Sequence, residues 1–98
     1  MKLSELIVAV KERNLSKDML EQYRDALANL SAQMSLEMAE IEKAEAIFLE
    51  QSEEPKAVFS QRKWAVTEKG QRQITLKHSL RAIDKLYSSI KSRLYQLY

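Results

Sequence analysis

The chain of 98 residues has no cysteine and contains only one glycine, Gly70, one proline, Pro55, and one histidine, His78. Without cysteine there are no disulfides and no thiolate metal sites. Scarce turn-forming residues leave little room for strands and favour a few long helices. A lone histidine with no evident partners does not support a catalytic triad, and one glycine excludes a glycine-rich phosphate loop. We therefore expect no enzymatic activity, no cofactor and no bound metal.

Long apolar runs are also missing. No stretch approaches the ~20 apolar residues that span a bilayer. The mildly apolar start of the chain contains Glu5 and is followed at once by Lys11, Glu12 and Arg13. This pattern is typical of an amphipathic helix and not of a signal peptide. We expect a protein that does not enter a membrane and that works in the cytoplasm.

The formal net charge of +2 hides an asymmetry between the two halves of the chain. Residues 1–54 carry twelve acidic and six basic side chains, a difference of −6, and residues 55–98 carry two acidic and ten basic, a difference of +8. Such a separation can mark a nucleic-acid-binding face. It can equally mean that an acidic helix lies against a basic one and neutralises it.

Apolar periodicity predicts three helices, over 3–13, 17–50 and 56–96, with a turn at 51–56. Both long helices carry apolar residues on alternating steps of three and four, which we call the seam, and Ser16 is a good N-cap for the second helix. We predict a single all-α domain: a long, coiled-coil-like antiparallel hairpin with a short N-terminal third helix. The clearest part of the pattern is Leu76, Leu80, Ile83, Tyr87, Ile90, Leu94 and Leu97.

The register of this hairpin follows from folding the two long helices back on each other about residues 53–54. Ile41 then faces Val66, and Glu37 falls near Lys69 and Gly70. The short N-terminal helix can cover the open end of the hairpin.

Gly70 lies inside the predicted third helix, where glycine costs about 1 kcal/mol relative to alanine. Gly70 either allows a close helix approach, which we favour, or allows a kink, or residues 67–70 mark a break between two helices. Trp64 and Ile74 are expected to point away from the seam, so we predict that they contact a partner.

A row of cations on the third helix is the strongest chemical signal. Three of them recur every four residues on the side away from the seam, where they are free to neutralise phosphates. Three more flank this row. Alternatively, these cations are ordinary surface charge with no ligand, and the carboxylate of Asp84 offsets part of their positive charge. The predicted nucleic-acid contacts are Arg72, Lys77, Arg81, Lys85, Lys91 and Arg93.

The segment 36–54 is strongly acidic, with seven glutamates against Lys43 alone. Di-iron bundles use Glu-x-x-His pairs, but the position three before His78 is Thr75, so we expect a solvated face and not a metal site. An acidic face of this kind could bind a protein partner. Its predicted contacts are Glu40, Glu42 and Glu50.

The C-terminus is apolar, and exposed apolar patches often mark self-association. We therefore expect a homo-oligomer. The residues concerned are Leu94, Tyr95, Leu97 and Tyr98.

Three strings of the sequence resemble a family of small tailed-phage proteins of unassigned function. They are LEMAEIEKAEA at 36–46, Trp64-x-x-Thr67-x-x-Gly70-Gln71-x-x-Ile74-x-Leu76-Lys77, and SSIKSRL at 88–94. The resemblance covers most of the chain from about Ser16 onward. It implies a virus-encoded protein in the cytoplasm of an infected bacterial host.

The C-terminal half also resembles, more distantly, the UvsY-type recombination mediators of T-even phages. The closest match is Ile90-Lys91-Ser92-Arg93 near the end of a long helix. Such mediators are helical, oligomeric and non-enzymatic; they bind single-stranded DNA and help to load a recombinase past single-strand-binding protein. The resemblance implies that Lys91 and Arg93 contact phosphates.

Taken together, these features predict a non-enzymatic phage accessory protein that binds single-stranded DNA or a DNA-processing partner in recombination or replication. The main alternative is a helical protein–protein module, such as a phage inhibitor of a host defence or transcription complex, and a third possibility is a structural component of the virion.

Overall fold

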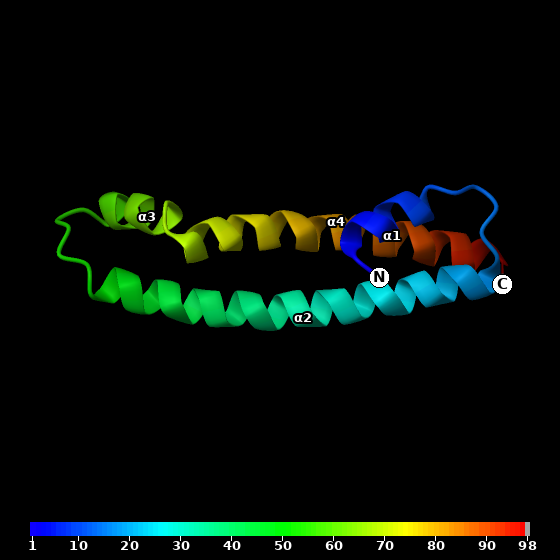
Figure 1. Ribbon diagram of the computed structural model, residues 1–98, viewed down its shortest axis with the longest axis horizontal. Coiled ribbons are helices and arrows are strands. Elements are labelled where there is room, and N and C mark those ends of the chain that lie inside the picture. Colours follow the sequence, from blue (N-terminus) through cyan, green and yellow to red (C-terminus); the bar gives the residue numbers. More distant parts are fainter. Residues whose placement is uncertain (98) are drawn as a thin grey trace.

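The computed structural model describes residues 1–97, which form four helices: α1 (Leu3–Val10), α2 (Lys17–Glu50), α3 (Ala57–Ala65) and α4 (Glu68–Leu97). α2 and α4 run antiparallel along a molecule of 57 × 20 × 18 Å (Figure 1). The predicted all-α fold, a long antiparallel hairpin with a short N-terminal helix, is confirmed. Tyr98 lies outside the described residues.

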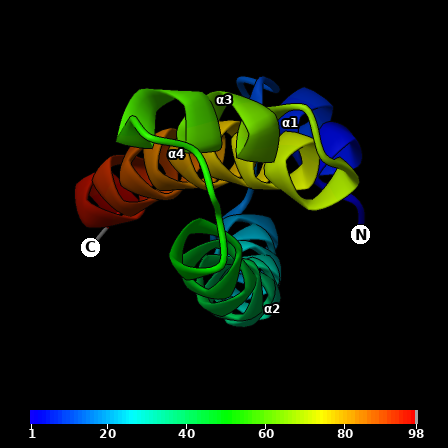
Figure 2. The ribbon, with the colours of Figure 1, turned by 90° about the vertical axis from the view of Figure 1, so that its left-hand side faces the viewer.

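The two short helices lie on opposite flanks of α4. Figure 2 shows α3 on one flank, at the closed end of the hairpin, and α1 on the other, toward the open end. Both short helices also contact α2. Each end of the hairpin is therefore a small three-helix assembly, and α2 and α4 are common to both ends.

α2 spans the range predicted from the sequence. The Ser16 hydroxyl accepts a hydrogen bond of 3.2 Å from the backbone N–H of Met19, which caps the first turn. Asp18 adds negative charge at the positive end of the helix dipole. At about 1.5 Å per residue, 34 residues give a rod of roughly 50 Å, so α2 runs along nearly the whole molecule.

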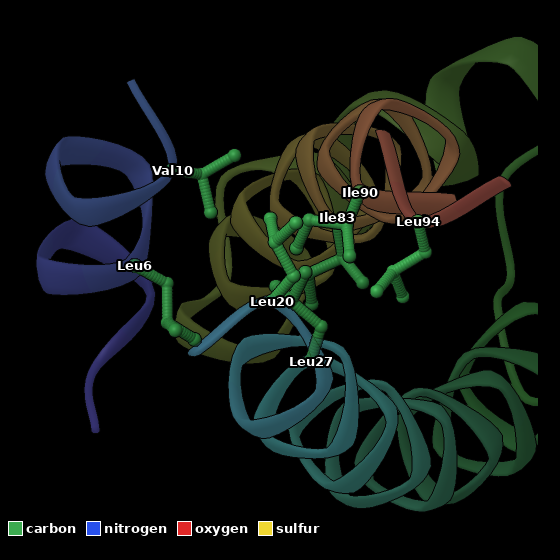
Figure 3. Close-up of a cluster of buried hydrophobic side chains, with 7 residues drawn as sticks. All are labelled: Leu6, Val10, Leu20, Leu27, Ile83, Ile90 and Leu94. Atoms are coloured by element: carbon green, nitrogen blue, oxygen red, sulfur yellow. The ribbon is translucent and has the colours of Figure 1, made fainter. Parts of the chain in front are cut away.

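The buried apolar side chains form two clusters. The open-end cluster joins α1, α2 and α4 (Figure 3), and the closed-end cluster joins α2, α3 and α4. Met34 packs against both of them. The open-end cluster is Leu6, Val10, Leu20, Leu27, Ile83, Ile90 and Leu94, and the closed-end cluster is Met38, Ile41, Trp64 and Leu76.

α1 is shorter than predicted, because it ends at Val10 and not at residue 13. The guanidinium of Arg93, on α4, donates hydrogen bonds of 2.7 Å to the backbone carbonyl oxygens of Val10 and Glu12. These contacts satisfy carbonyl groups that a continuing helix would otherwise have used. The end of α1 is therefore held against α4 by a side chain from the far end of the sequence.

The prediction of one helix over 56–96 is wrong. The helix breaks at Val66 and Thr67, which separate α3 from α4. The Thr67 hydroxyl donates a hydrogen bond of 2.6 Å to the carbonyl oxygen of Trp64 and accepts one of 3.0 Å from the backbone N–H of Gly70. Thr67 therefore closes α3 and caps the start of α4.

Gly70 sits in the first turn of α4, against the end of α3. A Cβ at this position would overlap the carbonyl oxygen of Trp64 and would lie 2.8 Å from its carbonyl carbon. The φ angle of Gly70 is not positive, so glycine is needed for space and not for an unusual backbone conformation. Close approach and helix break, which the sequence offered as alternatives, occur together.

The break changes which side chain enters the core. Trp64 is 6% exposed and Val66 is 79% exposed, so the predictions that Trp64 points outward and that Val66 faces Ile41 are wrong. The Trp64 ring packs tilted on Phe48, with ring centroids 5.5 Å apart, and its Nε1 donates a hydrogen bond of 2.8 Å to Gln73 Oε1. A continuous helix would have carried the seam through Val66.

The exposed apolar surface at the C-terminal end of α4 is smaller than the sequence indicates. Leu94 is buried in the open-end cluster, while Tyr95 and Leu97 are exposed. Across residues 1–97, none of the helices combines the length and apolarity needed to cross a membrane.

Candidate nucleic-acid interface

The two long helices carry opposite charge. α4 has seven basic and two acidic residues, a difference of +5, whereas α2 has three basic and eight acidic residues, a difference of −5. The sequence left open whether these charges neutralise each other. Within residues 1–97, the only ion pair that joins α2 to α4 is Arg72–Glu37, so most of the positive charge of α4 faces solvent.

Lys77, Arg81 and Lys85 form the basic stripe. All three are exposed, and the part of the chain that the structure describes places no acidic partner within ion-pair distance of them. Residues four apart on a helix are about 6 Å apart along the axis and about 40° apart around it. The stripe is therefore a gently winding row of cations, with Asp84 beside it as the one nearby anion on α4.

The buried face of α4 holds this row in place. Leu76, Ile83 and Ile90 face the core, and they lie on the side of the helix away from the stripe. Because these side chains fix the rotation of α4, the basic stripe cannot turn toward α2 without opening the core. Lys91 is exposed as well and extends the positive surface toward the C-terminal end of α4.

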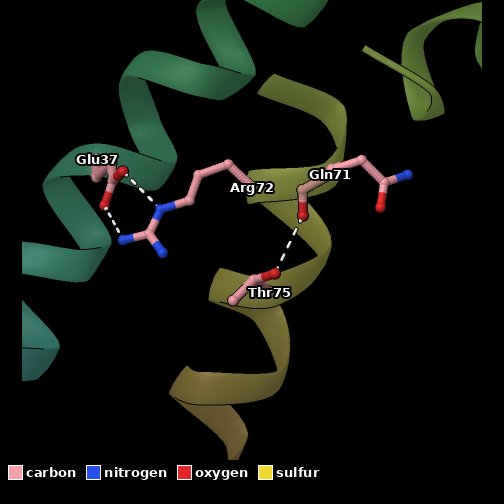
Figure 4. Close-up of polar contacts among 4 residues, drawn as sticks. All are labelled: Glu37, Gln71, Arg72 and Thr75. Atoms are coloured by element: carbon pink, nitrogen blue, oxygen red, sulfur yellow. Dashed lines mark hydrogen bonds and ion pairs between the residues drawn. The ribbon is translucent and has the colours of Figure 1, made fainter. Parts of the chain in front are cut away.

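Arg72 does not extend the stripe. Its guanidinium donates two hydrogen bonds to the carboxylate of Glu37, at 2.8 and 2.9 Å (Figure 4). This bidentate hydrogen bonding lowers the pKa of Glu37 and raises that of Arg72. The pair joins α2 to α4 two to three residues beyond the predicted meeting of Glu37 with Lys69 and Gly70. We therefore leave Arg72 out of the interface.

Arg93 is also engaged within the chain, through its hydrogen bonds to the carbonyl oxygens at the end of α1. A guanidinium held in this way is not free to contact a phosphate. The interface is therefore reduced from the six predicted residues to four: Lys77, Arg81, Lys85 and Lys91.

The residues predicted to contact a protein partner do not form one surface. Trp64 is in the core, and Ile74 is 44% exposed. Glu40, Glu42 and Glu50 are all exposed, but Glu40 and Glu42, two positions apart, project about 160° from each other. The expected continuous acidic face is therefore divided between different sides of α2.

Glu40 lines a groove of about 710 Å³ between α2 and α4. The buried side chain of Ile41 lies in this groove, and charged and polar groups surround it. The lining also includes the Glu37–Arg72 pair of Figure 4 and Thr75, whose hydroxyl donates a hydrogen bond of 3.2 Å to the carbonyl oxygen of Gln71.

Candidate metal ligands are not brought together among residues 1–97. His78 is exposed, and no set of three or more His, Asp or Glu side chains in residues 1–97 comes together as a metal site.

Sequence reasoning missed the roles of Thr67 and Gln73. The first had a usable signal, because Thr67-Glu68-Lys69-Gly70 places an N-cap residue and a first-turn acid ahead of a helix. The role of Gln73 had no signal in the sequence, because a polar residue at an apolar seam position does not reveal which side chain it will bind.

Comparison of the chain with protein-family models, with curated proteins and with solved structures finds no match. The resemblance to phage proteins and to recombination mediators stays a prediction from the residues that carry it.

Proposed function

We propose that this chain is a non-enzymatic binding protein that holds single-stranded DNA along the outer face of α4. One observation carries the proposal: the basic stripe of Lys77, Arg81 and Lys85 is exposed on a helix whose opposite face is fixed in the core. Cations placed in this way release counterions from a phosphate backbone when they bind it.

The biological setting of this activity rests on the resemblance in sequence. The strings shared with small tailed-phage proteins support a phage accessory protein in the cytoplasm of an infected bacterium. The more distant likeness to recombination mediators supports a role in recombination or replication, with the DNA strand or a DNA-processing protein as the partner.

Fluorescence anisotropy of a labelled single-stranded oligonucleotide, at low and at near-physiological salt, tests the proposal. We expect micromolar or tighter binding at low salt. The slope of log affinity against log salt should be roughly −3, because four phosphate contacts on a single strand each contribute about −0.7.

Charge reversal localises the binding. The variant Lys77→Glu/Arg81→Glu/Lys85→Glu should lose most of the affinity and most of the salt slope without loss of helix content. The matched control, Lys2→Glu/Lys43→Glu/Lys56→Glu, makes the same change in total charge at exposed positions outside α4 and should retain binding more nearly like that of the wild type. Equal losses in the two variants, or no binding by the wild type at low salt, would refute the proposal.

A second candidate function, a helical protein–protein module such as a phage inhibitor of a host complex, is favoured by the groove beside the Glu37–Arg72 pair. A pull-down from infected cells should then lose the partner with Glu40→Lys, which changes the groove lining. Glu42→Lys, on another side of α2, is the control. Loss of the partner in both variants, or in neither, would argue against the groove.

A further inference from the structure

A shallow hollow lies on α4 near its C-terminal end. Its lining brings together an ammonium group, a hydroxyl, an aromatic ring and a primary amide, from Lys91, Ser92, Tyr95 and Gln96. All four residues are exposed. Tyr95 is 83% exposed, the highest value among the large apolar side chains in the described part of the chain. Its ring packs on no second aromatic ring there.

The hollow lies on the face of α4 that carries the basic stripe. Lys77 and Tyr95 are 95 − 77 = 18 residues apart, which is five turns of 3.6 residues, so the two side chains project in the same direction. Lys91 precedes Tyr95 by about one turn, or roughly 6 Å along the axis. Tyr95 lies ten residues beyond Lys85, which is roughly 15 Å along the axis and about 80° around it. A strand that leaves the stripe at Lys85 and continues along this face toward the C-terminal end of α4 therefore comes within reach of the ring.

We infer that this hollow is a base-stacking subsite, in which the Tyr95 ring stacks on one unpaired base and the Lys91 ammonium contacts a neighbouring phosphate. The inference rests on the proposed function, since it adds a second kind of contact to the same interface. The Ser92 hydroxyl and the Gln96 amide supply hydrogen-bond donors and acceptors at the edge of the hollow for the sugar and the base.

The subsite makes the interface selective for unpaired strands. In a duplex each base is stacked between its neighbours, so the Tyr95 ring has no free base face to contact, whereas the lysine and arginine contacts form with either kind of strand. Every base has a π-face, so stacking of this kind tolerates any sequence. We expect a preference for single over double strands, without a preference among bases.

Three fluorescent ligands of equal length test the inference: an oligothymidylate, an abasic strand with the same sugar–phosphate backbone, and a duplex. The wild type should bind the oligothymidylate about tenfold more tightly than the abasic strand, the effect expected of one base–aromatic stack. Tyr95→Ala should abolish this difference and leave the salt slope unchanged. Tyr95→Phe keeps the ring and should preserve the difference. Titration with an oligouridylate then distinguishes DNA from RNA as the source of the strand.

The subsite and the phosphate-binding proposal can fail separately. Equal binding of the oligothymidylate and the abasic strand by the wild type, or a preference that survives Tyr95→Ala, overturns the subsite alone. No binding of any strand overturns both. If Tyr95→Ala lowers the sedimentation coefficient and leaves the discrimination between strands intact, Tyr95 is a self-association contact and the subsite is overturned. Circular dichroism should show the same helix content in all variants, because Tyr95 is exposed.

Discussion

The indole Nε1 of Trp64 donates a hydrogen bond of 2.8 Å to Oε1 of Gln73, and both residues are buried. The bond joins α3 to α4 across the helix break, so it connects two segments that the backbone no longer holds as one rod. It also satisfies an indole N–H that would otherwise be buried without a partner.

The first prediction concerns this bond. Gln73→Leu should destabilise the protein by about 1–3 kcal/mol, because it leaves the indole N–H buried and unpaired. Urea unfolding followed by circular dichroism measures the change in the free energy of unfolding. Gln73→Glu, which keeps an acceptor oxygen at this position, should retain the Trp64 contact at a pH where the carboxyl is protonated. A Gln73→Leu protein as stable as the wild type would mean that the bond contributes nothing.

The second prediction concerns Gly70. Gly70→Ala should destabilise the protein by roughly 1–3 kcal/mol, the usual cost of inserting a methyl group where there is no room, even though alanine is the better helix former. The new Cβ would meet the backbone of Trp64, which cannot move aside as a flexible side chain can. Ser88→Ala, at an exposed site in the middle of α4, is the control and should be neutral or slightly stabilising. Thermal unfolding of the two variants provides the comparison, and a gain in stability for Gly70→Ala would contradict the close approach.

The third prediction concerns Arg93. Arg93→Ala should loosen α1, because it removes the donors that hold the carbonyl oxygens of Val10 and Glu12. Loss of charge-assisted hydrogen bonds of this kind costs about 1.5–3 kcal/mol. Amide hydrogen exchange should show faster exchange in α1 and little change in α3. Arg93→Lys should restore only part of the exchange protection of α1, since an ammonium group cannot reproduce the planar fork of a guanidinium. Unchanged protection of α1 in Arg93→Ala would show that the apolar contacts of Leu6 and Val10 suffice.

The fourth prediction concerns pH. Arg72 holds the pKa of Glu37 below its usual value of 4.5, chiefly through the side-chain hydrogen bonds. Because the folded-state pKa is the lower one, the stability that this pair contributes is present above pH 4.5 and is lost as the pH falls through the folded-state pKa. Arg72→Gln should return the pKa of Glu37 toward its usual value, and titration of the Glu37 carboxyl by NMR measures this shift. An unchanged titration of Glu37 in Arg72→Gln would mean that the hydrogen bonds from Arg72 do not lower the pKa of Glu37.

The hairpin itself could be predicted from the sequence, because each long helix repeats its apolar residues with a regular period. Ser16 marked the start of α2, and residues such as Leu27, Leu76 and Ile90 are buried as their period requires. These features depend on local sequence alone, so no knowledge of the partner helix was needed.

The register at the closed end could not be predicted in the same way. The heptad count assumed one continuous helix through Val66, and a break of two residues changes the direction in which every earlier side chain points. Trp64 therefore occupies the place expected of Val66. The break itself depends on Thr67 and Gly70 acting together, and neither residue alone is decisive.

The same limit applies to the site. Lys77, Arg81 and Lys85 were found because residues four apart share a helix face. Arg72 and Arg93 were included for their charge, but their hydrogen-bond partners lie 35 and more than 80 residues away in the sequence. The sequence therefore could not separate arginines with partners inside the fold from cations that face solvent.

The opposite charges of α2 and α4 give the molecule an electric dipole across its short axis. The two helices carry −5 and +5, and the molecule is about 20 Å wide, which is roughly twice the Debye length at 0.1 M salt. A polyanion within about one Debye length of the surface therefore exerts a torque on the molecule as well as an attraction, and turns α4 toward itself before contact. This orientation should be pronounced at low ionic strength and should fade as salt is added, so the rate of association should fall with salt in addition to the affinity.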